Sequence, residues 1–212
     1  MPRLTKEQKF AVDCRDSFKF FVEEALKATP STQQYELIDA IQNSVDGKAK
    51  RHIATRSAHG TGKTTTLAWA TLWFGLTRSE AKIPILAPVQ AQIAKQLMPE
   101  IRKWHQKLFP LFKDSVEVQA QSVRFSNGNE AFAKVANADN PESVAGVHAK
   151  NLLWLIDEAS GIPDVIFEVI QGSLTEENFT VVMTSNPTRV TGTFYDAFHK
   201  SRAHYQLLHF NS

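Results

Sequence analysis

Cysteine is almost absent from this chain, because Cys14 is the single example among 212 residues. One thiol can form neither an internal disulfide nor a cysteine-rich metal site, so we expect a protein of a reducing, cytosolic setting. Long apolar runs are also missing. The most apolar stretch, residues 67–76, is far shorter than the ~20 residues of a membrane-spanning helix, and the first residues lack the apolar segment of a signal peptide. No membrane association is expected.

An excess of charge of either sign is lacking too. Lys and Arg number 24 against 22 Asp and Glu, which leaves a formal net charge of +2. This balance excludes a histone-like polybasic protein, although it permits a locally basic face. Hydrophobic residues make up 42% of the chain, which is enough for the buried core of one domain.

Short apolar segments alternate with segments of helical periodicity along the chain. We predict buried strands at residues 52–54, 83–87, 152–156 and 179–183, and helices at 17–28, 31–41, from 63 and at about 90–107. Between 115 and 136 apolar and polar residues alternate, and the Ser-Asn-Gly-Asn segment 126–129 predicts a tight hairpin turn. Strands that alternate with helices predict a mostly parallel sheet covered on both faces.

A loop of small residues joins the first predicted strand to the helix that begins at Lys63. In such a loop, successive backbone N–H groups can surround a phosphate, and the helix N-terminus favours negative charge. Lys63 would reach the β- and γ-phosphates of a nucleotide, and the Thr64 hydroxyl would bind Mg²⁺. An ordinary glycine-containing turn is the alternative, since Ser57 replaces the first consensus glycine. The predicted nucleotide-binding residues here are Ser57, Ala58, His59, Gly60, Thr61, Gly62, Lys63, Thr64 and Thr65.

A pair of acids, Asp157 and Glu158, directly follows the apolar segment 152–156. At the end of a buried strand, Asp157 is in the place of a metal-holding acid, and Glu158 can orient and deprotonate an attacking water. In isolation such a pair could simply cap the next helix. Together with the upstream loop it predicts nucleotide hydrolysis, with the acid-bearing strand next to the strand that leads into the loop.

Four blocks of this sequence, spanning about residues 30 to 200, resemble the ATPase domain of phage terminase large subunits, the motors that package DNA into procapsids. The blocks are residues 33–41, the phosphate-binding loop, residues 138–164 with the acid pair, and residues 184–195. In the first block, Gln34 best matches a glutamine that reads the adenine edge, for which an amide offers both a donor and an acceptor. A solvated helix residue is an equal alternative for Gln34.

The last block resembles the family's coupling motif. By this resemblance Thr184, Ser185 and Asn186 sense the γ-phosphate and transmit its loss to a lid. An ordinary polar start of a loop is the alternative.

The resemblance also implies a fold, ligands and partners. The fold is a three-layer α/β P-loop NTPase of the RecA-like (ASCE) class, with a helical N-terminal segment (about 1–47), a core (48–186) and a small C-terminal lid (187–212). The implied ligands are ATP and Mg²⁺. The implied partners are double-stranded DNA, a portal protein, a small terminase subunit and further copies in a ring, in the host cell cytoplasm. The acids after Glu158 form no second acidic strand, so we expect a shortened chain without the family's nuclease domain and without nuclease activity.

One departure from the family concerns a catalytic arginine. Many terminases carry it in the loop, four residues before the lysine, where this chain has His59. Arg56 is therefore predicted to be catalytic, as a candidate that acts within the chain; a simple pairing with an acid at the strand end is the alternative. Arg102, Arg124 and Arg189 are further candidates, some of which would act on a neighbouring subunit.

Two other functions stay open at this point. A superfamily-2-like helicase shares the paired acids and the upstream glutamine, but it needs a second RecA-like domain for which the chain is too short. A nucleotide-dependent scaffold would bind ATP without hydrolysing it, and the presence of Lys63 and Glu158 argues against this role.

Overall fold

The computed structural model describes residues 4–58, 60–174 and 178–211. The strands are β1 His52–Ser57, β2 Ala81–Ala87, β3 Val116–Val118, β4 Ser122–Phe125, β5 Glu130–Val135, β6 Asn151–Asp157, β7 Asn178–Ser185 and β8 Tyr205–Phe210. They form one 8-stranded sheet in the order β3-β4-β5-β2-β6-β7-β1-β8. Pairing is parallel from β5 across to β8, whereas β3, β4 and β5 pair antiparallel at one edge. The predicted mostly parallel sheet is confirmed.

The strand that carries the acid pair does not adjoin the strand that leads into the loop. β7 lies between β6 and β1 and pairs in parallel with both, so the predicted adjacency of these two strands is wrong. β7 ends in Thr184 and Ser185. Their side chains are short, so the loop after β1 can still approach the acid pair after β6 across the end of β7. A strand that comes later in the chain can insert between two earlier ones, and no local pattern in the sequence reports it.

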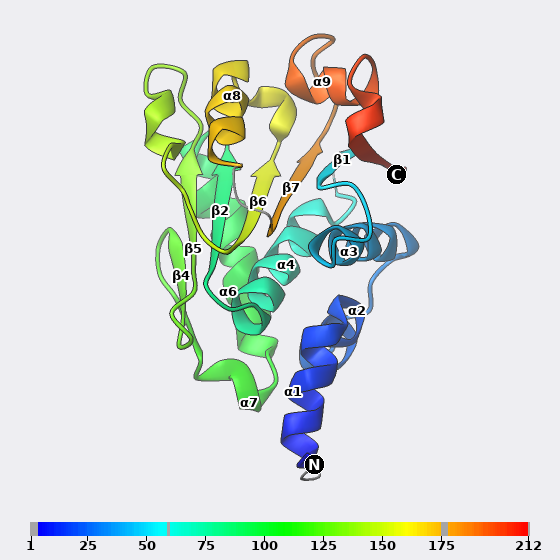
Figure 1. Ribbon diagram of the computed structural model, residues 1–212, viewed down its shortest axis with the longest axis vertical. Helices are drawn as coiled ribbons and strands as arrows, with labels where there is room; N and C mark the ends of the chain where they lie inside the picture. Colours follow the sequence, from blue (N-terminus) through cyan, green and yellow to red (C-terminus); the bar gives the residue numbers. More distant parts are fainter. Residues whose placement is uncertain (1–3, 59, 175–177, 212) are drawn as a thin grey trace.

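Helices cover both faces of the sheet (Figure 1). The segments are α1 Lys6–Asp16, α2 Phe18–Phe20, the π-helical η1 Phe21–Ala25, α3 Thr32–Val45, α4 Lys63–Thr77, α5 Gln90–Gln92, the π-helical η2 Ile93–Leu97, α6 Met98–Lys107, α7 Pro110–Lys113, η3 Pro141–Val144, η4 Ala159–Gly161, α8 Asp164–Ser173, α9 Thr193–Phe198 and η5 Arg202–His204. Helices α1 to α6 pack on one face, and α8 and α9 pack on the other. β6 contributes Leu153 and Leu155 to the first core and Trp154 and Ile156 to the second, because successive strand residues point to opposite faces.

Two helical segments differ from the sequence-based expectation. The helix predicted at about 90–107 passes through the π-helical η2, and Pro99 lies in the first turn of α6. α1 was not predicted, although Thr5 and Gln8 form a capping box at its start, a pattern that is readable from sequence. None of the helices built by the described residues combines the length and apolar character needed to cross a lipid bilayer.

The segment predicted as a lid, residues 187–212, is partly a component of the sheet. β8 pairs with β1 over the whole of both strands, from His52–Tyr205 to Ser57–Phe210. The side chains of Tyr205 and Phe210 are buried in the two cores. Residues 205–210 thus extend the sheet, and the lid stays a prediction, which now concerns mainly residues 187–204. The partner of β8 is β1, which lies about 150 residues upstream, and a pairing over that distance has no local signal in the sequence.

Two buried tryptophans provide a test of the core. Trp73 Nε1 donates to the Cys14 carbonyl at 3.0 Å, whereas Trp154 Nε1 has no partner among the described residues. Both side chains are fully buried. We expect Trp73→Phe to lower the free energy of unfolding by about 1–2 kcal/mol more than Trp154→Phe, because only the first change leaves a buried acceptor unpaired. Equal losses in chemical denaturation would contradict this assignment.

Candidate functional site

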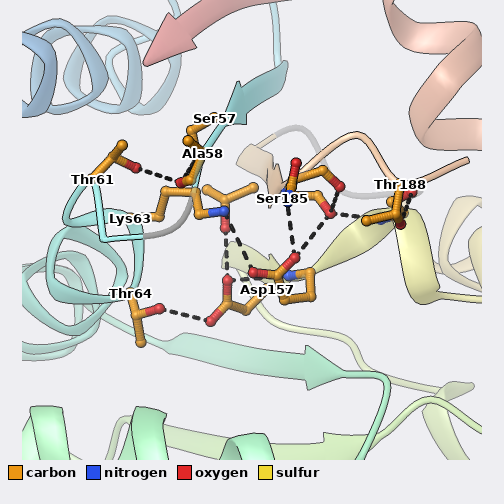
Figure 2. A network of polar contacts seen from close by, with 12 residues as sticks. Ser57, Ala58, Thr61, Lys63, Thr64, Asp157, Ser185 and Thr188 are labelled. Atoms are coloured by element: carbon orange, nitrogen blue, oxygen red, sulfur yellow. Dashed lines mark hydrogen bonds and ion pairs between the residues drawn. The ribbon is translucent and has the colours of Figure 1, made fainter. Parts of the chain in front are cut away.

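The loop between β1 and α4 is shaped by two glycines. Gly60 and Gly62 have φ of 76° and 83°, in the left-handed region that residues with a Cβ avoid. No side chain caps the start of α4, so the backbone N–H groups of its first turn are left for another acceptor. The Thr61 hydroxyl donates to the Ala58 carbonyl at 3.1 Å and tightens the loop (Figure 2). Such an arrangement suits a bound anion.

Lys63 extends from the first turn of α4 toward the acid pair. Its ammonium lies 3.4 Å from Glu158 Oε1, and its side chain is 6% exposed. Glu158 has a φ of 51°, which is unusual for a residue other than glycine. Backbone in this region costs about 1–3 kcal/mol and tends to occur at functional sites. The strand end therefore holds Glu158 in a conformation that its own preference disfavours.

Asp157 is the most enclosed carboxylate of the site, with 3% of its surface exposed. Its Oδ2 accepts from the Thr64 hydroxyl at 3.0 Å, and its Oδ1 accepts from the Thr184 hydroxyl at 3.0 Å (Figure 2). Burial raises the pKa of Asp157 above its ordinary value despite these two bonds. A buried carboxylate beside a hydroxyl is a hard oxygen donor set of the kind Mg²⁺ prefers, so the residues fit this ion. Among the described residues no group of three or more His, Cys, Asp or Glu could hold a metal.

The second oxygen of Glu158 is held from the end of β7. Glu158 Oε2 accepts from the Ser185 hydroxyl at 3.2 Å and from the Asn186 N–H at 3.3 Å. Ser185 Oγ also accepts from the Ser160 N–H at 3.1 Å, and the Ser160 hydroxyl lies 3.1 Å from that of Thr188 (Figure 2). Thus a chain of bonds leads from Glu158 to the segment after β7. The parts played by Ser160 and Thr188 were missed from the sequence, which offers no independent signal for them.

Gln34 lies beside the loop, and only 8% of its surface is exposed. The alternative that Gln34 is a solvated helix residue is therefore wrong. It lines a cavity of about 560 Å³ between the start of α3 and the loop, with Asn211 at its edge. The Gln34 amide accepts from the Ser31 N–H at 3.0 Å and donates to the Gly62 carbonyl at 3.2 Å. Reading an adenine base with this amide would require an exchange of these bonds, so that role stays a prediction.

Two predicted residues, Arg56 and Thr65, have side chains that contact other elements. Arg56 bonds to His209 and lies over the ring of Phe198 at 5.2 Å, on the α9 side of β1, whereas α4 packs on the opposite side. The side chain of Thr65 turns to Glu100 on α6, at 2.7 Å. His59 lies outside the described residues.

The other candidate arginines lie on α6, on β4 and in the segment after β7. Arg102 donates to the Gln119 carbonyl at 2.6 Å, and Arg124 is exposed on β4. Arg189 lines a small cavity of about 80 Å³ next to Asp164 and Gly192. A catalytic role for Arg56 or for any of these residues stays a prediction.

Comparison with known proteins identifies the relatives. No family model matches the chain. A probable terminase large subunit of Enterobacteria phage P7 is 32% identical over 183 residues, which cover 81% of this chain and 35% of that protein. This chain is a relative of the phage terminase large subunits. It spans about a third of the length of that curated relative.

Solved structures establish the fold of this terminase relative. The Thermus phage P74-26 large terminase ATPase domain is 20% identical and has a TM-score of 0.63, with 92% of this chain and 85% of that chain covered. The HK97 bacteriophage large terminase is 14% identical, with a TM-score of 0.67 over 97% of this chain and 44% of that chain. A large terminase of a thermophilic bacteriophage, solved in complex with ADP, is 12% identical, with a TM-score of 0.66 over 85% and 45%. The predicted P-loop NTPase fold is confirmed.

Proposed function

We propose that this terminase relative hydrolyses ATP and that hydrolysis drives double-stranded DNA into a viral procapsid. One observation carries the proposal: Lys63 and Thr64 of the loop bond to Glu158 and Asp157 across the intervening strand, at 3.4 and 3.0 Å. These are the residue types that phosphoryl transfer requires, brought together at the carboxyl ends of parallel strands. The ADP complex of a solved large terminase supports the choice of a nucleotide.

ATP would lie across the loop, with its phosphates at the start of α4 and its base toward the cavity beside Gln34. Thr64 and Asp157 would hold Mg²⁺, which when bound supplies positive charge to the phosphate oxygens. The first-turn N–H groups and the ammonium of Lys63 would bind the remaining oxygens. The enclosed position of Lys63, 6% exposed, strengthens its attraction to a phosphate because little water screens it.

Glu158 is the proposed general base. Its Oε1 is paired with Lys63, and the phosphates of ATP would compete for the same ammonium. Glu158 Oε1 would then accept a proton from the water that attacks the γ-phosphate. Ser185 and the Asn186 N–H hold Oε2, so the carboxylate stays oriented while Oε1 is free.

Coupling would follow the bonds from Glu158 through Ser185 to Ser160 and Thr188. Departure of the γ-phosphate changes the partners of Glu158 and therefore the partners of Ser185. Thr188 lies in the segment that links β7 to α9, so movement there would be passed to residues 187–204, the part for which a lid role stays a prediction.

Ser185→Ala tests how Glu158 is positioned. We expect kcat for ATP to fall about tenfold with the Kd for ATP unchanged, because a bond to a charged group worth about 1.5 kcal/mol is lost. Ser173→Ala is the matched control, since Ser173 is also buried but bonds to the Ile170 carbonyl at the end of α8. An equal loss of kcat in both variants, or a loss of ATP binding in Ser185→Ala alone, would rule out this role.

The proposed function is tested by phosphate release from ATP with Mg²⁺, at several protein concentrations and with or without double-stranded DNA. Turnover that DNA stimulates supports the motor. A rate per subunit that rises with concentration supports a ring in which a neighbour donates an arginine. ATP binding without turnover under every condition would favour the scaffold alternative.

The partners and setting belong to the same proposal. A portal protein, a small terminase subunit and further copies of the chain in a ring are the expected assembly, in the host cell cytoplasm. Nuclease activity is not expected of the described residues. Cleavage of a circular plasmid by the purified chain would overturn this last point.

A further inference from the structure

Glu100 of α6 forms a compact polar contact with the helix that starts the phosphate-binding site. Its Oε1 accepts from the Thr65 hydroxyl at 2.7 Å, from Trp104 Nε1 at 2.8 Å and from Lys103 at 3.0 Å. The carboxylate is 18% exposed. Burial raises the pKa of Glu100, but the bonds from Thr65, Lys103 and Trp104 outweigh it, so the net pKa is lowered and the group stays charged.

The place of Thr65 gives this contact its significance. Thr65 is in the first turn of α4 and directly follows Lys63 and Thr64, which bond to the acid pair. No side chain caps this turn, although the Gln34 amide holds the Gly62 carbonyl at its N-terminal end at 3.2 Å. The bond to Glu100 fixes the turn from its flank as well.

A second contact joins the same two helices. The rings of Trp104 on α6 and Trp69 on α4 meet edge to face, with centroids 5.2 Å apart. The Trp104 indole is therefore held at one end by Glu100 and at its ring by Trp69. Together the two contacts leave the start of α4 little freedom to rotate or slide against α6.

We propose that Glu100 is a positioning residue for nucleotide binding, which acts through Thr65 to aim the first turn of α4 at the phosphates. The inference rests on the proposed function of this site. Glu100 does not touch the nucleotide in this role, and its charge is partly offset by Lys103. Loss of the contact lets the first turn tilt, so phosphate binding weakens, whereas the groups that react with water are left in place.

The test compares Thr65→Val with Thr77→Val. Both threonines lie on α4 and bond through their hydroxyls, but Thr77 bonds to the Trp73 carbonyl at the far end of the helix. Valine keeps the shape of threonine and removes the hydroxyl. We expect Thr65→Val to raise the KM for Mg·ATP and the Kd for Mg·ADP about fivefold, with kcat changed less than about twofold. Thr77→Val is expected to leave KM and Kd unchanged.

Glu100 is tested by a conservative and a disruptive change. Glu100→Gln keeps an acceptor for Thr65 and Trp104, so it should bind Mg·ADP like the unaltered chain. Glu100→Leu removes the acceptor and should raise the Kd as Thr65→Val does, and the double variant should be no worse than either single one. Identical KM and Kd in Thr65→Val and Thr77→Val would overturn the inference, even if Glu100→Leu failed to fold.

The same measurements separate this inference from the proposed function. If the unaltered chain is inert toward ATP, hydrolysis fails, yet the Kd for Mg·ADP in calorimetry still decides the role of Thr65. Suppose instead that the unaltered chain hydrolyses ATP and that Lys63→Ala abolishes this hydrolysis. If Thr65→Val then keeps the KM and Kd of the unaltered chain, only the inference about Glu100 fails.

Discussion

Glu158→Gln is expected to lower kcat for ATP by about 10²–10⁴-fold, the usual contribution of a general base. Glutamine keeps the size of the side chain, and its amide can still bond to Ser185, but it cannot accept the proton of the attacking water. The change also removes the charged partner of Lys63, whose side chain is 6% exposed, so the thermal midpoint should fall. Phosphate release gives kcat, and ATP binding and the thermal midpoint are measured on the same preparation.

The binding result makes this test specific. Lys63 is paired with Glu158 in the structure, so removal of the negative charge frees Lys63 and should leave ATP binding equal or tighter. Glu168→Gln, an exposed glutamate on α8, is the matched control and should keep full activity. Unchanged kcat in Glu158→Gln would move the role of general base to another residue and remove the mechanism proposed above.

Gly62→Ala is expected to weaken ATP binding at least tenfold. Gly62 has a φ of 83°, and a Cβ there would lie 2.6 Å from Gln34 Nε2 and 3.0 Å from Gln34 Cδ. The left-handed backbone alone costs an alanine about 1–2 kcal/mol. Gln34 must also move, which breaks its bonds to the Gly62 carbonyl and to the cap of α3. The loop then loses both its shape and its support.

Gly128 serves as a control that separates the effect of backbone strain from the effect of the collision with Gln34. Gly128 has a φ of 86° in the hairpin turn, and a Cβ there meets nothing within 4 Å. Gly128→Ala should therefore lower the thermal midpoint through backbone strain and leave ATP binding intact. Adding Gln34→Ala to Gly62→Ala removes the collision and should restore part of the stability. If Gly62→Ala bound ATP normally, the loop would not be the phosphate site.

The local parts of the site could be predicted from the sequence. The small residues before Lys63 and the apolar run before Asp157 are each a pattern of fewer than ten consecutive residues, so each can be read directly from the sequence. The capping box of α1, from Thr5 to Gln8, was equally local and was overlooked.

The relations between distant segments could not be predicted. β7 inserts between β6 and β1, and β8 adds to the other side of β1. Both pairings with β1 join residues 100 or more positions apart, and several strands of similar composition compete for each place. Strand pairing uses backbone groups that every residue has, so the sequence of one strand does not name its neighbour.

The direction of single side chains was decided by the tertiary structure as well. Arg56 was expected at the phosphates, but its place on β1 turns it to the α9 side, because strand residues alternate between faces. Thr65 was expected to face the nucleotide, but the helical turn directs it to Glu100. The sequence by itself determined which chemical groups this protein has and the short segments that hold them. Only the tertiary structure decided which of those groups meet, because contact depends on packing between segments that lie far apart in the chain.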